Sequence, residues 1–175
     1  MPWNVDPSHS SVGFGVRHML MSTVRGQFKD YAVAAEVDET DLSRSTATVT
    51  IQAASVDTGA PDRDAHLRSG DFFDVENHPL ITFATKRLEP KRDDGEYRLI
   101  GDLTIRGVTR EVALDAEVTA PLKDPWGNTK AGLSAEGKIN RKDFGLGWNA
   151  VLEAGGLVVG DSVKLAIDLE LAKAA

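Results

Sequence analysis

Along most of the chain, apolar side chains alternate at every second residue with polar or small ones. This alternation is cleanest at residues 111–120, where one face consists of Val112, Leu114, Ala116, Val118 and Ala120. Successive side chains of a β-strand point to opposite sides of the sheet, so each such segment predicts a strand with one buried face. We therefore expect an all-β protein.

Similar segments occur at residues 11–17, 24–28, 32–37, 46–53, 80–88, 97–106, 133–139 and 163–171. They are joined mainly by short turns such as Asp94-Gly95, and short connections indicate antiparallel pairing. Several segments run to about 10 residues, or roughly 33 Å at about 3.3 Å per residue. Strands of that length favour a tall closed barrel over a compact sandwich, in a single domain covering residues 1–175.

The clearest departure from this pattern lies at residues 58–74. Pro61 suits the first position of a helix, Asp62 and Asp64 add negative charge to its first turn, and Gly70 suits a left-handed end. We expect a short helix at about residues 61–69 and a single helical turn near residues 18–22.

Two basic side chains lie together on this predicted helix. Arg63 and His66 share one face with Leu67, and two aromatic residues, Phe72 and Phe73, follow directly. Such a helix is suited to closing one end of a barrel. The alternative is a surface helix whose charges are simply solvated.

The predicted inward faces are rich in small residues, namely Ala47, Ala53, Gly101, Ala116, Ala120, Ala135 and Gly137. A barrel of eight strands is just wide enough to be filled by side chains or to hold one small ligand. Small inward residues leave room for an apolar ligand, because an empty cavity is destabilising. They are equally compatible with a crowded centre around which larger residues pack, and the pattern alone leaves both interpretations open.

Composition and motifs exclude several classes of function. The net charge of −7 argues against binding to a nucleic-acid backbone, and the absence of cysteine removes thiolate chemistry and Cys–zinc sites. No GxSxG motif is present, and the four histidines have no metal-ligand spacing. A metal site combining His18, His66 or His78 with a carboxylate stays open as an alternative. We expect no cofactor other than a bound ligand.

Targeting signals are also missing from the sequence as given. No apolar run approaches the roughly 18 residues of a membrane span. The first residues, MPWNVD, lack the charged and apolar regions of an export signal, which favours a cytoplasmic protein. A chain trimmed of its signal, and therefore periplasmic, would give the same pattern.

Seven motifs, in order along nearly the whole chain, carry a family resemblance. They are WNVDPSHS (residues 3–10), VGFGVRH (12–18), VRGQF (24–28), RDAHLRSGDFFD (63–74), HPLITF (78–83), GDLTIRGVTR (101–110) and NRKDFGL (140–146). With these motifs the sequence resembles the YceI-like family of bacterial lipocalin-like proteins.

The resemblance implies an extended eight-stranded antiparallel lipocalin-like barrel whose apolar pore binds a polyisoprenoid, such as a polyprenyl phosphate, or an isoprenoid quinone. The implied role is non-enzymatic binding, transport or storage of that lipid, with no nucleic-acid partner and with homodimer formation as a further possibility. Two alternatives remain: an enzyme acting on such a lipid with His18 or His66 as acid–base, and a sequestering or interaction module whose barrel is filled by its own side chains.

The candidate ligand-binding residues are those on the predicted inward faces, at the helix and in the 140–148 segment. They are Phe14, Val16, His18, Met19, Phe28, Val49, Ile51, Arg63, His66, Phe72, Phe73, Ile81, Phe83, Leu103, Ile105, Leu114, Ala116, Val118, Leu133, Ala135, Ile139, Phe144, Leu146 and Trp148. Among these, Arg63, His66 and His18 are expected to meet the polar head of the lipid. The rival expectation is that Arg63 and Asp64 are structural and pair with loop residues to hold the helix in place.

Overall fold

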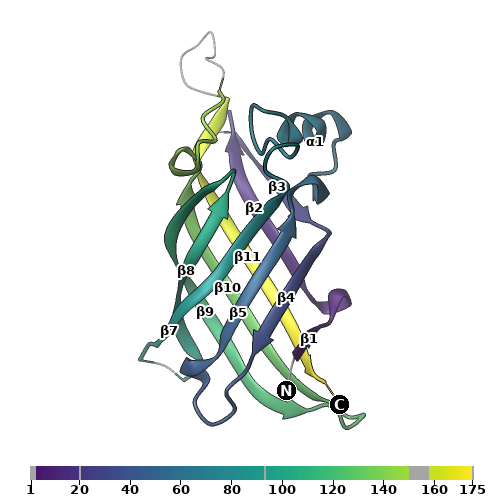
Figure 1. The fold of residues 1–175 in the computed structure, drawn as a ribbon, viewed down its shortest axis with the longest axis vertical. Helices are drawn as coiled ribbons and strands as arrows, with labels where there is room; N and C mark the ends of the chain where they lie inside the picture. The colour runs from purple at the N-terminus through teal and green to yellow at the C-terminus, as the bar shows by residue number, and fades with distance from the viewer. Residues whose placement is uncertain (1–2, 20, 93, 150–157, 175) are drawn as a thin grey trace.

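The alternating segments form one antiparallel sheet that closes on itself as a tall barrel (Figure 1). The computed structural model describes residues 3–19, 21–92, 94–149 and 158–174. Its strands are β1 (Trp3–Val5), β2 (Ser11–His18), β3 (Ser22–Phe28), β4 (Tyr31–Glu36), β5 (Thr46–Gln52), β6 (Val56–Asp57), β7 (Leu80–Pro90), β8 (Glu96–Ile105), β9 (Val108–Lys123), β10 (Thr129–Asn140) and β11 (Val159–Lys173). The sheet closes because β1 pairs with both β4 and β11.

The eleven strands occupy eight positions around the barrel, because β1 with β2, β3 with β4 and β5 with β6 each form one kinked strand. Both β1 and β2 lie along β11, separated by the 3-10 turn η1 (Pro7–His9). Likewise β3 pairs with β2 and β4 with β1, with the break at residues 29–30. After β5, the turn η3 (Ala53–Ser55) leads into β6, which pairs with β3. The expected closed eight-stranded antiparallel barrel is therefore confirmed.

The helical turn expected near residues 18–22 is wrong. β2 continues to His18, which pairs with Ser22 of β3, and the amide of Met21 donates to the carbonyl of His18 over 3.0 Å. Met19 adopts a left-handed φ of 53°. The segment is thus the tip of a hairpin, whose cross-strand pairing overrides the helix preference of a Met-Leu-Met run.

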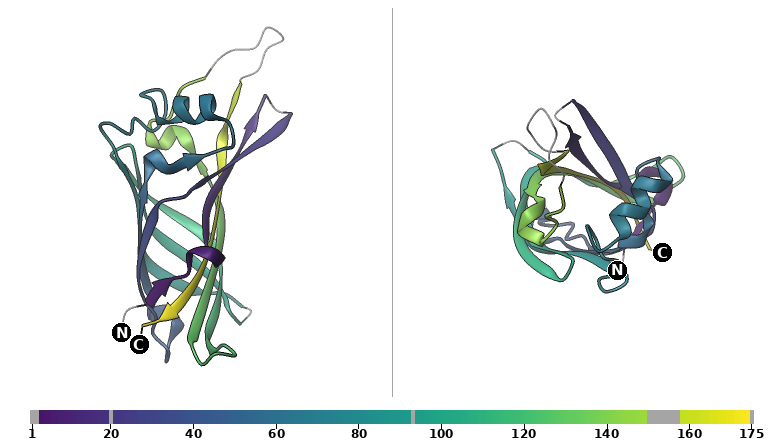
Figure 2. Two further views of the ribbon diagram at one scale, coloured as in Figure 1. Left: turned by 90° about the vertical axis from the view of Figure 1, so that its right-hand side faces the viewer. Right: turned by 90° about the horizontal axis from the view of Figure 1, so that it is seen from above.

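The expected helix is confirmed as α1 (Pro61–Arg68), which lies over one side of the upper end of the barrel (Figure 2). Its Asp64 carboxylate is buried and accepts hydrogen bonds from the amide and hydroxyl of Thr58 at 2.9 and 2.5 Å. At the other end, the Ser69 hydroxyl donates to the carbonyl of His66 over 2.6 Å. Gly70 does not take the expected left-handed conformation, because Ser69 ends the helix in extended geometry.

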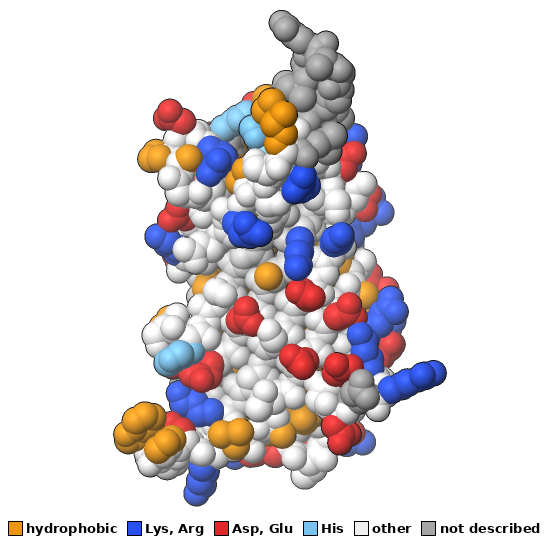
Figure 3. Space-filling model, turned by 180° about the vertical axis from the view of Figure 1, so that it is seen from behind, with side chains coloured by type: hydrophobic (Ala, Val, Ile, Leu, Met, Phe, Trp, Pro, Cys, Tyr) orange, Lys and Arg blue, Asp and Glu red, His pale blue; other side chains and the backbone are white. Residues whose placement is uncertain are grey.

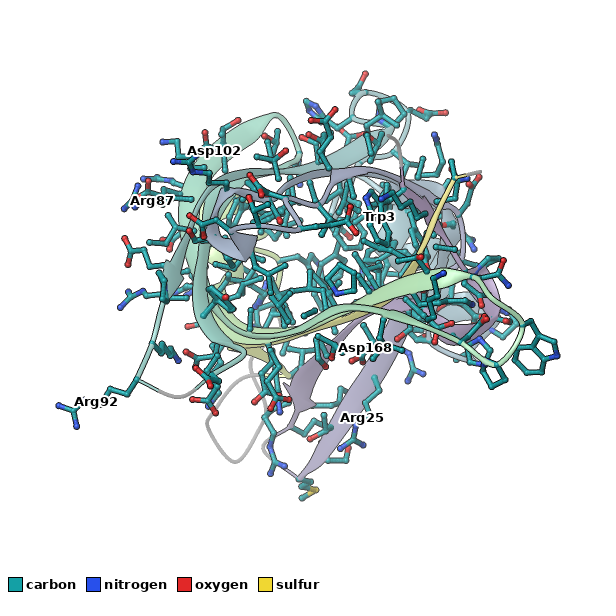
Figure 4. All side chains as sticks on the ribbon, turned by 90° about the horizontal axis from the view of Figure 1, so that it is seen from below. Trp3, Arg25, Arg87, Arg92, Asp102 and Asp168 are labelled. Carbon is teal, nitrogen blue, oxygen red and sulfur yellow. The ribbon has the colours of Figure 1, made fainter. Side chains whose placement is uncertain are left out.

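The end of the barrel near the chain termini is filled by a small apolar cluster. The cluster consists of Trp3, Ala35, Ala131, Leu169 and Leu171. Seen from that end, Trp3 points inside the ring, whereas Arg87, Asp102 and Asp168 project outside it (Figure 4). We call this the closed end, because Trp3 is only 3% exposed there.

Several small inward residues make room for large side chains of the neighbouring strand. A Cβ on Gly101 would clash with the Phe83 ring, and one on Gly26 would lie 2.5 Å from Cζ of Phe14. A Cβ on Gly137 would lie 2.6 Å from Cδ2 of Leu114. At these positions the crowded-centre interpretation is correct, and the space left by glycine is occupied by the protein itself.

Candidate functional site

A cavity of about 290 Å³ occupies the half of the barrel beneath α1. Its apolar lining comes from the described residues of most strands, from α1 and from the loops beside it. It comprises Val12, Phe14, Val16, Val24, Phe28, Val49, Ile51, Leu67, Phe72, Phe73, Ile81, Phe83, Leu103, Ile105, Leu114, Ile139, Leu146, Trp148, Val158, Val159, Val163, Leu165 and Ile167, with the backbone of Gly13. Along β11 the lining runs from Val159 to Ile167, or roughly 26 Å of strand at about 3.3 Å per residue. The space is deep and suits an extended apolar chain.

One wall of the cavity is a row of branched aliphatic side chains. Ile139 of β10 pairs with Val163 of β11, which pairs with Val16 of β2, which pairs with Val24 of β3. All four side chains line the cavity. Cross-strand pairing of residues that point inward therefore produces a continuous apolar wall.

Aromatic rings cover the mouth of the cavity, which we define as its end at α1. The His66 ring meets Phe72 and Trp148 edge to face, at centroid distances of 5.0 and 4.6 Å. Its Nε2 lies 2.8 Å from an oxygen of Asp71, which fixes the orientation of the imidazole. Phe72 and Trp148 also contact each other, with centroids 5.5 Å apart. The helix and the loop after β10 thus meet through side chains that border the opening.

Arg63 combines a structural contact with a place at the mouth. Its Nε and one terminal nitrogen each donate over 2.7 Å to Thr58, to the hydroxyl and to the carbonyl. The rival expectation that Arg63 holds the helix to a loop is therefore confirmed. The same side chain also lines the cavity, and a guanidinium has five N–H groups, so donors remain available.

A buried arginine outside the predicted set of ligand-binding residues organises the loop at the mouth. Arg141, only 3% exposed, begins the turn η4 (Arg141–Phe144). It donates to the carbonyls of Gly160, Leu146 and Trp148 at 2.8, 2.5 and 2.9 Å. Burial lowers the pKa of Arg141, and the nearby Asp161 carboxylate, 3.7 Å away, opposes that shift. Its only sequence signal was its place in the NRKDFGL motif.

Most of the predicted ligand-binding residues line the cavity. Those that do are Phe14, Val16, His18, Phe28, Val49, Ile51, Arg63, His66, Phe72, Phe73, Ile81, Phe83, Leu103, Ile105, Leu114, Ile139, Leu146 and Trp148. Among the polar lining residues, His18, Arg63 and His66 were predicted, whereas Arg17 and Arg141 were missed. Half of the missed apolar side chains, namely Val159, Val163, Leu165 and Ile167, come from β11, whose alternation was recognised without being assigned to the pore.

The structure places six predicted residues away from the cavity. Ala116, Val118, Leu133 and Ala135 lie on β9 and β10 nearer the closed end, where Ala116 pairs with Ala135 and both are buried in the core. Met19 belongs to the hairpin tip, and Phe144 is packed in the core at 1% exposure. Alternation identified the inward face correctly but not the depth at which the cavity ends.

Among the described residues, one group of three side chains could in principle bind a metal ion, and it lies outside the cavity, at η1 and β11. It consists of Asp6, His9 and Glu170, and contains none of the histidines proposed for a metal site. Lys130 lies between both carboxylates, with its Nζ 3.6 Å from Asp6 and 3.3 Å from Glu170. A lysine ammonium at that position makes the group an ion-pair network linking η1 to β10 and β11. Separately, none of the described helices is long and apolar enough to cross a membrane.

Comparison with known proteins supports both the fold and its relationships. A UPF0312 protein of Staphylococcus epidermidis is 39% identical over 169 residues, covering 96% of this chain and 95% of the relative. The crystal structure of a Campylobacter jejuni YceI protein matches with a TM-score of 0.75 and 33% identity, over 91% of this chain and 90% of that one. A polyisoprenoid binding domain from Saccharophagus degradans shares the fold at 16% identity and a TM-score of 0.70, over 98% of both chains.

The family model agrees with these matches over almost the whole length of the chain. The model of the YceI-like domain matches residues 3–171, which span all eight barrel positions and the cavity. The resemblance noted from the seven motifs is confirmed: this chain belongs to the YceI-like family.

Proposed function

We propose that the barrel binds one long apolar chain bearing an anionic head group, a lipid of the polyprenyl phosphate class, and carries or stores it unchanged. The observation that supports this most directly is the chemistry of the lining. The body of the cavity is apolar, and the titratable side chains on its inner surface are His18, Arg63, His66 and Arg141, whereas Arg17 at its edge is exposed on the outer face of β2. No aspartate or glutamate occurs among the described lining residues. In a chain of net charge −7, that is a selective placement of basic groups.

Physical chemistry assigns separate roles to the two parts of the cavity. Apolar surface transferred from water gains roughly 25 cal/mol per Å², which favours burial of a hydrocarbon chain. A polar head buried without partners loses about 1–3 kcal/mol or more, so it stays at the mouth. Arginine pairs with phosphate through several N–H groups, and Arg63 retains such groups beside the opening. An isoprenoid quinone, which is neutral, would use the same pore but gain less from these cations.

Fold neighbours are consistent with this class of ligand. The Saccharophagus degradans neighbour is described as a polyisoprenoid binding domain.

Extraction of the purified protein with organic solvent, followed by mass spectrometry, tests the proposal. We expect a prenyl-type lipid at close to one per barrel. An extract with no apolar compound, from a protein that also fails to take up added prenyl phosphate or quinone, would overturn it.

The head group can be tested with matched ligands. Replacing both Arg63 and His66 with Ala should weaken binding of a prenyl phosphate far more than binding of the prenyl alcohol of equal length. Thr58→Val is the control, because it removes a hydroxyl that holds Arg63 and Asp64 while keeping the charge at the mouth. Equal weakening of both ligands, or weakening that follows lost thermal stability, would leave Arg63 and His66 as structural residues.

Catalysis has one supporting observation, the pairing of His66 with Asp71, which resembles a base and its orienting partner. The described lining, however, contains no serine, threonine, lysine or tyrosine to act as nucleophile. Binding without reaction is therefore the proposal. Recovery of a prenyl phosphate chemically altered after incubation with the protein would favour the enzyme instead.

A further inference from the structure

A row of basic residues crosses four neighbouring strands on the outer surface of the barrel. Lys138 of β10 pairs with Lys164 of β11, which pairs with Gly15 of β2, which pairs with Arg25 of β3. Lys138, Lys164 and Arg25 are exposed, and we call these three residues the basic row. Arg25 projects outside the ring in Figure 4. Like charges directly opposite each other on paired strands are destabilising, so folding alone does not account for the Lys138–Lys164 pair.

The sign of the surface charge reverses on the same face toward the closed end. One row down, Asp115 pairs with Glu136, and in the next row Glu117 and Asp168 both pair with Ser134. Figure 3 shows this face with basic side chains over its upper half and acidic side chains below them.

The basic row is only partly neutralised by the acidic residues. Lys164 pairs with Glu136 at 3.4 Å. Among residues 3–19, 21–92, 94–149 and 158–174, Lys138 and Arg25 have no carboxylate within 4.0 Å. The row therefore presents a positive potential at the end of the barrel that holds the mouth.

The basic row forms the outside of the same wall that is apolar inside. Each of its residues is one position from a member of the inward row: Lys138 adjoins Ile139, Lys164 adjoins Val163, and Arg25 adjoins Val24. Because side chains alternate along a strand, the cavity wall and the basic surface are two faces of one piece of sheet. A partner that contacts this surface lies directly beside the cavity.

An apolar tip extends beyond the basic row on two of the same strands. The β2–β3 hairpin turns at Met19 and Met21, and Met21 is 80% exposed. Exposed Arg17 lies on β2 between the tip and the row. Apolar side chains flanked by basic ones are the pattern with which proteins attach to an anionic bilayer: the former enter the interface and the latter attract the head groups.

We propose that the basic row and the hairpin tip together form a docking surface for an anionic lipid bilayer, which brings the mouth of the cavity to the membrane. The choice of partner rests on the charge complementarity of the row and on the apolar tip, which a soluble polyanion would not use. This proposal goes beyond lipid binding in the cavity and is measured without any cavity ligand. Its failure therefore leaves the proposed function intact.

Vesicle flotation tests the proposal with the full chain. We expect the protein to float with vesicles of phosphatidylcholine containing one part in three of phosphatidylglycerol, to remain behind with phosphatidylcholine alone, and to dissociate as salt is raised. Reversal of the basic row (Arg25→Glu, Lys138→Glu and Lys164→Glu) should reduce partitioning by at least about tenfold, since each basic residue near an anionic surface contributes roughly fivefold. Met21→Ser should reduce it several-fold at unchanged charge.

Matched controls lie at the closed end and away from the row. Arg44→Glu, Arg98→Glu and Lys123→Glu make the same change in net charge at exposed sites. Trp126→Ser removes an exposed apolar side chain, 83% exposed, from the turn between β9 and β10. The proposal is overturned if wild-type protein ignores the anionic vesicles, or if the two control variants lose binding as much as the test variants. It is also overturned if Met21→Ser binds the anionic vesicles as well as wild type does and a soluble polyanion displaces the protein from them completely. The basic row would then recognise polyanions in general and not a bilayer.

Discussion

The imidazole of His66 stands edge to face against the indole of Trp148, with ring centroids 4.6 Å apart and planes at 85°. His66 belongs to α1, whereas Trp148 follows the turn η4, so this contact joins two separate elements across the mouth. Phe72 touches both rings. The three rings border the path by which a ligand would enter or leave, and their contacts should therefore control the rate of exchange more than the affinity of the apolar pore.

Trp148→Ala should accelerate ligand release. Each aromatic contact contributes about 0.5–1.5 kcal/mol, and Trp148 makes two of them, so we expect the dissociation rate to rise about tenfold. The measurement is transfer of a bound fluorescent prenyl lipid to acceptor vesicles. Trp126→Ala, which removes an exposed indole far from the mouth, is the control and should leave the rate unchanged. Equal rates in Trp148→Ala and wild type would show that exchange follows another route.

Val163→Phe should lower the amount of ligand bound. Val163 lies in the apolar wall between Val16 and Ile139, and a larger side chain there projects into the cavity. Ala116→Phe should behave differently, because Ala116 is packed in the core outside the cavity lining. It should cost about 1–3 kcal/mol of stability through overpacking while leaving ligand stoichiometry close to wild type. Extraction and chemical denaturation measure the two effects, and loss of ligand from a fully stable Ala116→Phe variant would contradict the assignment.

The contrast between Leu114 and Ala116 shows how far the sequence could be read. Alternation placed both side chains on the inward face, and the structure agrees. Only Leu114 reaches the cavity, however, because where the space ends depends on the side chains that fill the closed end, such as Trp3. Periodicity along one strand contains no information about that packing across the barrel.

Gly101 and Arg141 illustrate two other limits. From the sequence, the space left by Gly101 could be filled either by a ligand or by neighbouring side chains. In the structure the Phe83 ring fills it. Arg141 stands in a polar stretch whose sequence suggests an exposed turn. Its burial follows from the three carbonyls that accept its hydrogen bonds, those of Leu146, Trp148 and Gly160. Both outcomes depend on the three-dimensional position of a neighbouring group, a ring in one case and backbone carbonyls in the other, and residue periodicity does not encode that position.

Arg141→Met should be strongly destabilising. The substitution keeps much of the apolar stem but removes the donors to the carbonyls of Leu146, Trp148 and Gly160, and it leaves Asp161 without its buried partner. A buried carbonyl that loses its donor costs about 1–3 kcal/mol, and three carbonyls lose one here, so we expect a loss of several times that of an exposed ion pair. Lys142→Met is the matched control: Lys142 is exposed and pairs with the same aspartate at 3.4 Å, so we expect less than about 1 kcal/mol. Urea denaturation compares the two, and similar losses would mean that the buried bonds contribute little.

The ion-pair network at the N-terminal turn should make stability depend on pH through His9. The His9 Nδ1 lies 2.9 Å from Asp6 and 3.3 Å from Glu170, and Lys130 is the other charged group in the network. The hydrogen bond to Asp6, followed by the charge of Glu170, raises the pKa of His9 above 6.5, while Lys130 opposes the shift. His9 also holds the pKa of Asp6 well below its usual range, so Asp6 stays ionised throughout the window considered.

The sign of the effect follows from the raised pKa. A group whose pKa is higher in the folded than in the unfolded state contributes stability that is complete below its unfolded pKa, here 6.5, and that is lost as pH rises through the folded pKa. Wild type should therefore be more stable than His9→Gln at pH values just below 6.5, and the difference should shrink as the solution becomes alkaline. Thermal melts of both proteins across that range measure it. A His9→Gln difference that grew with pH would mean that neutral His9, and not the protonated form, stabilises the turn.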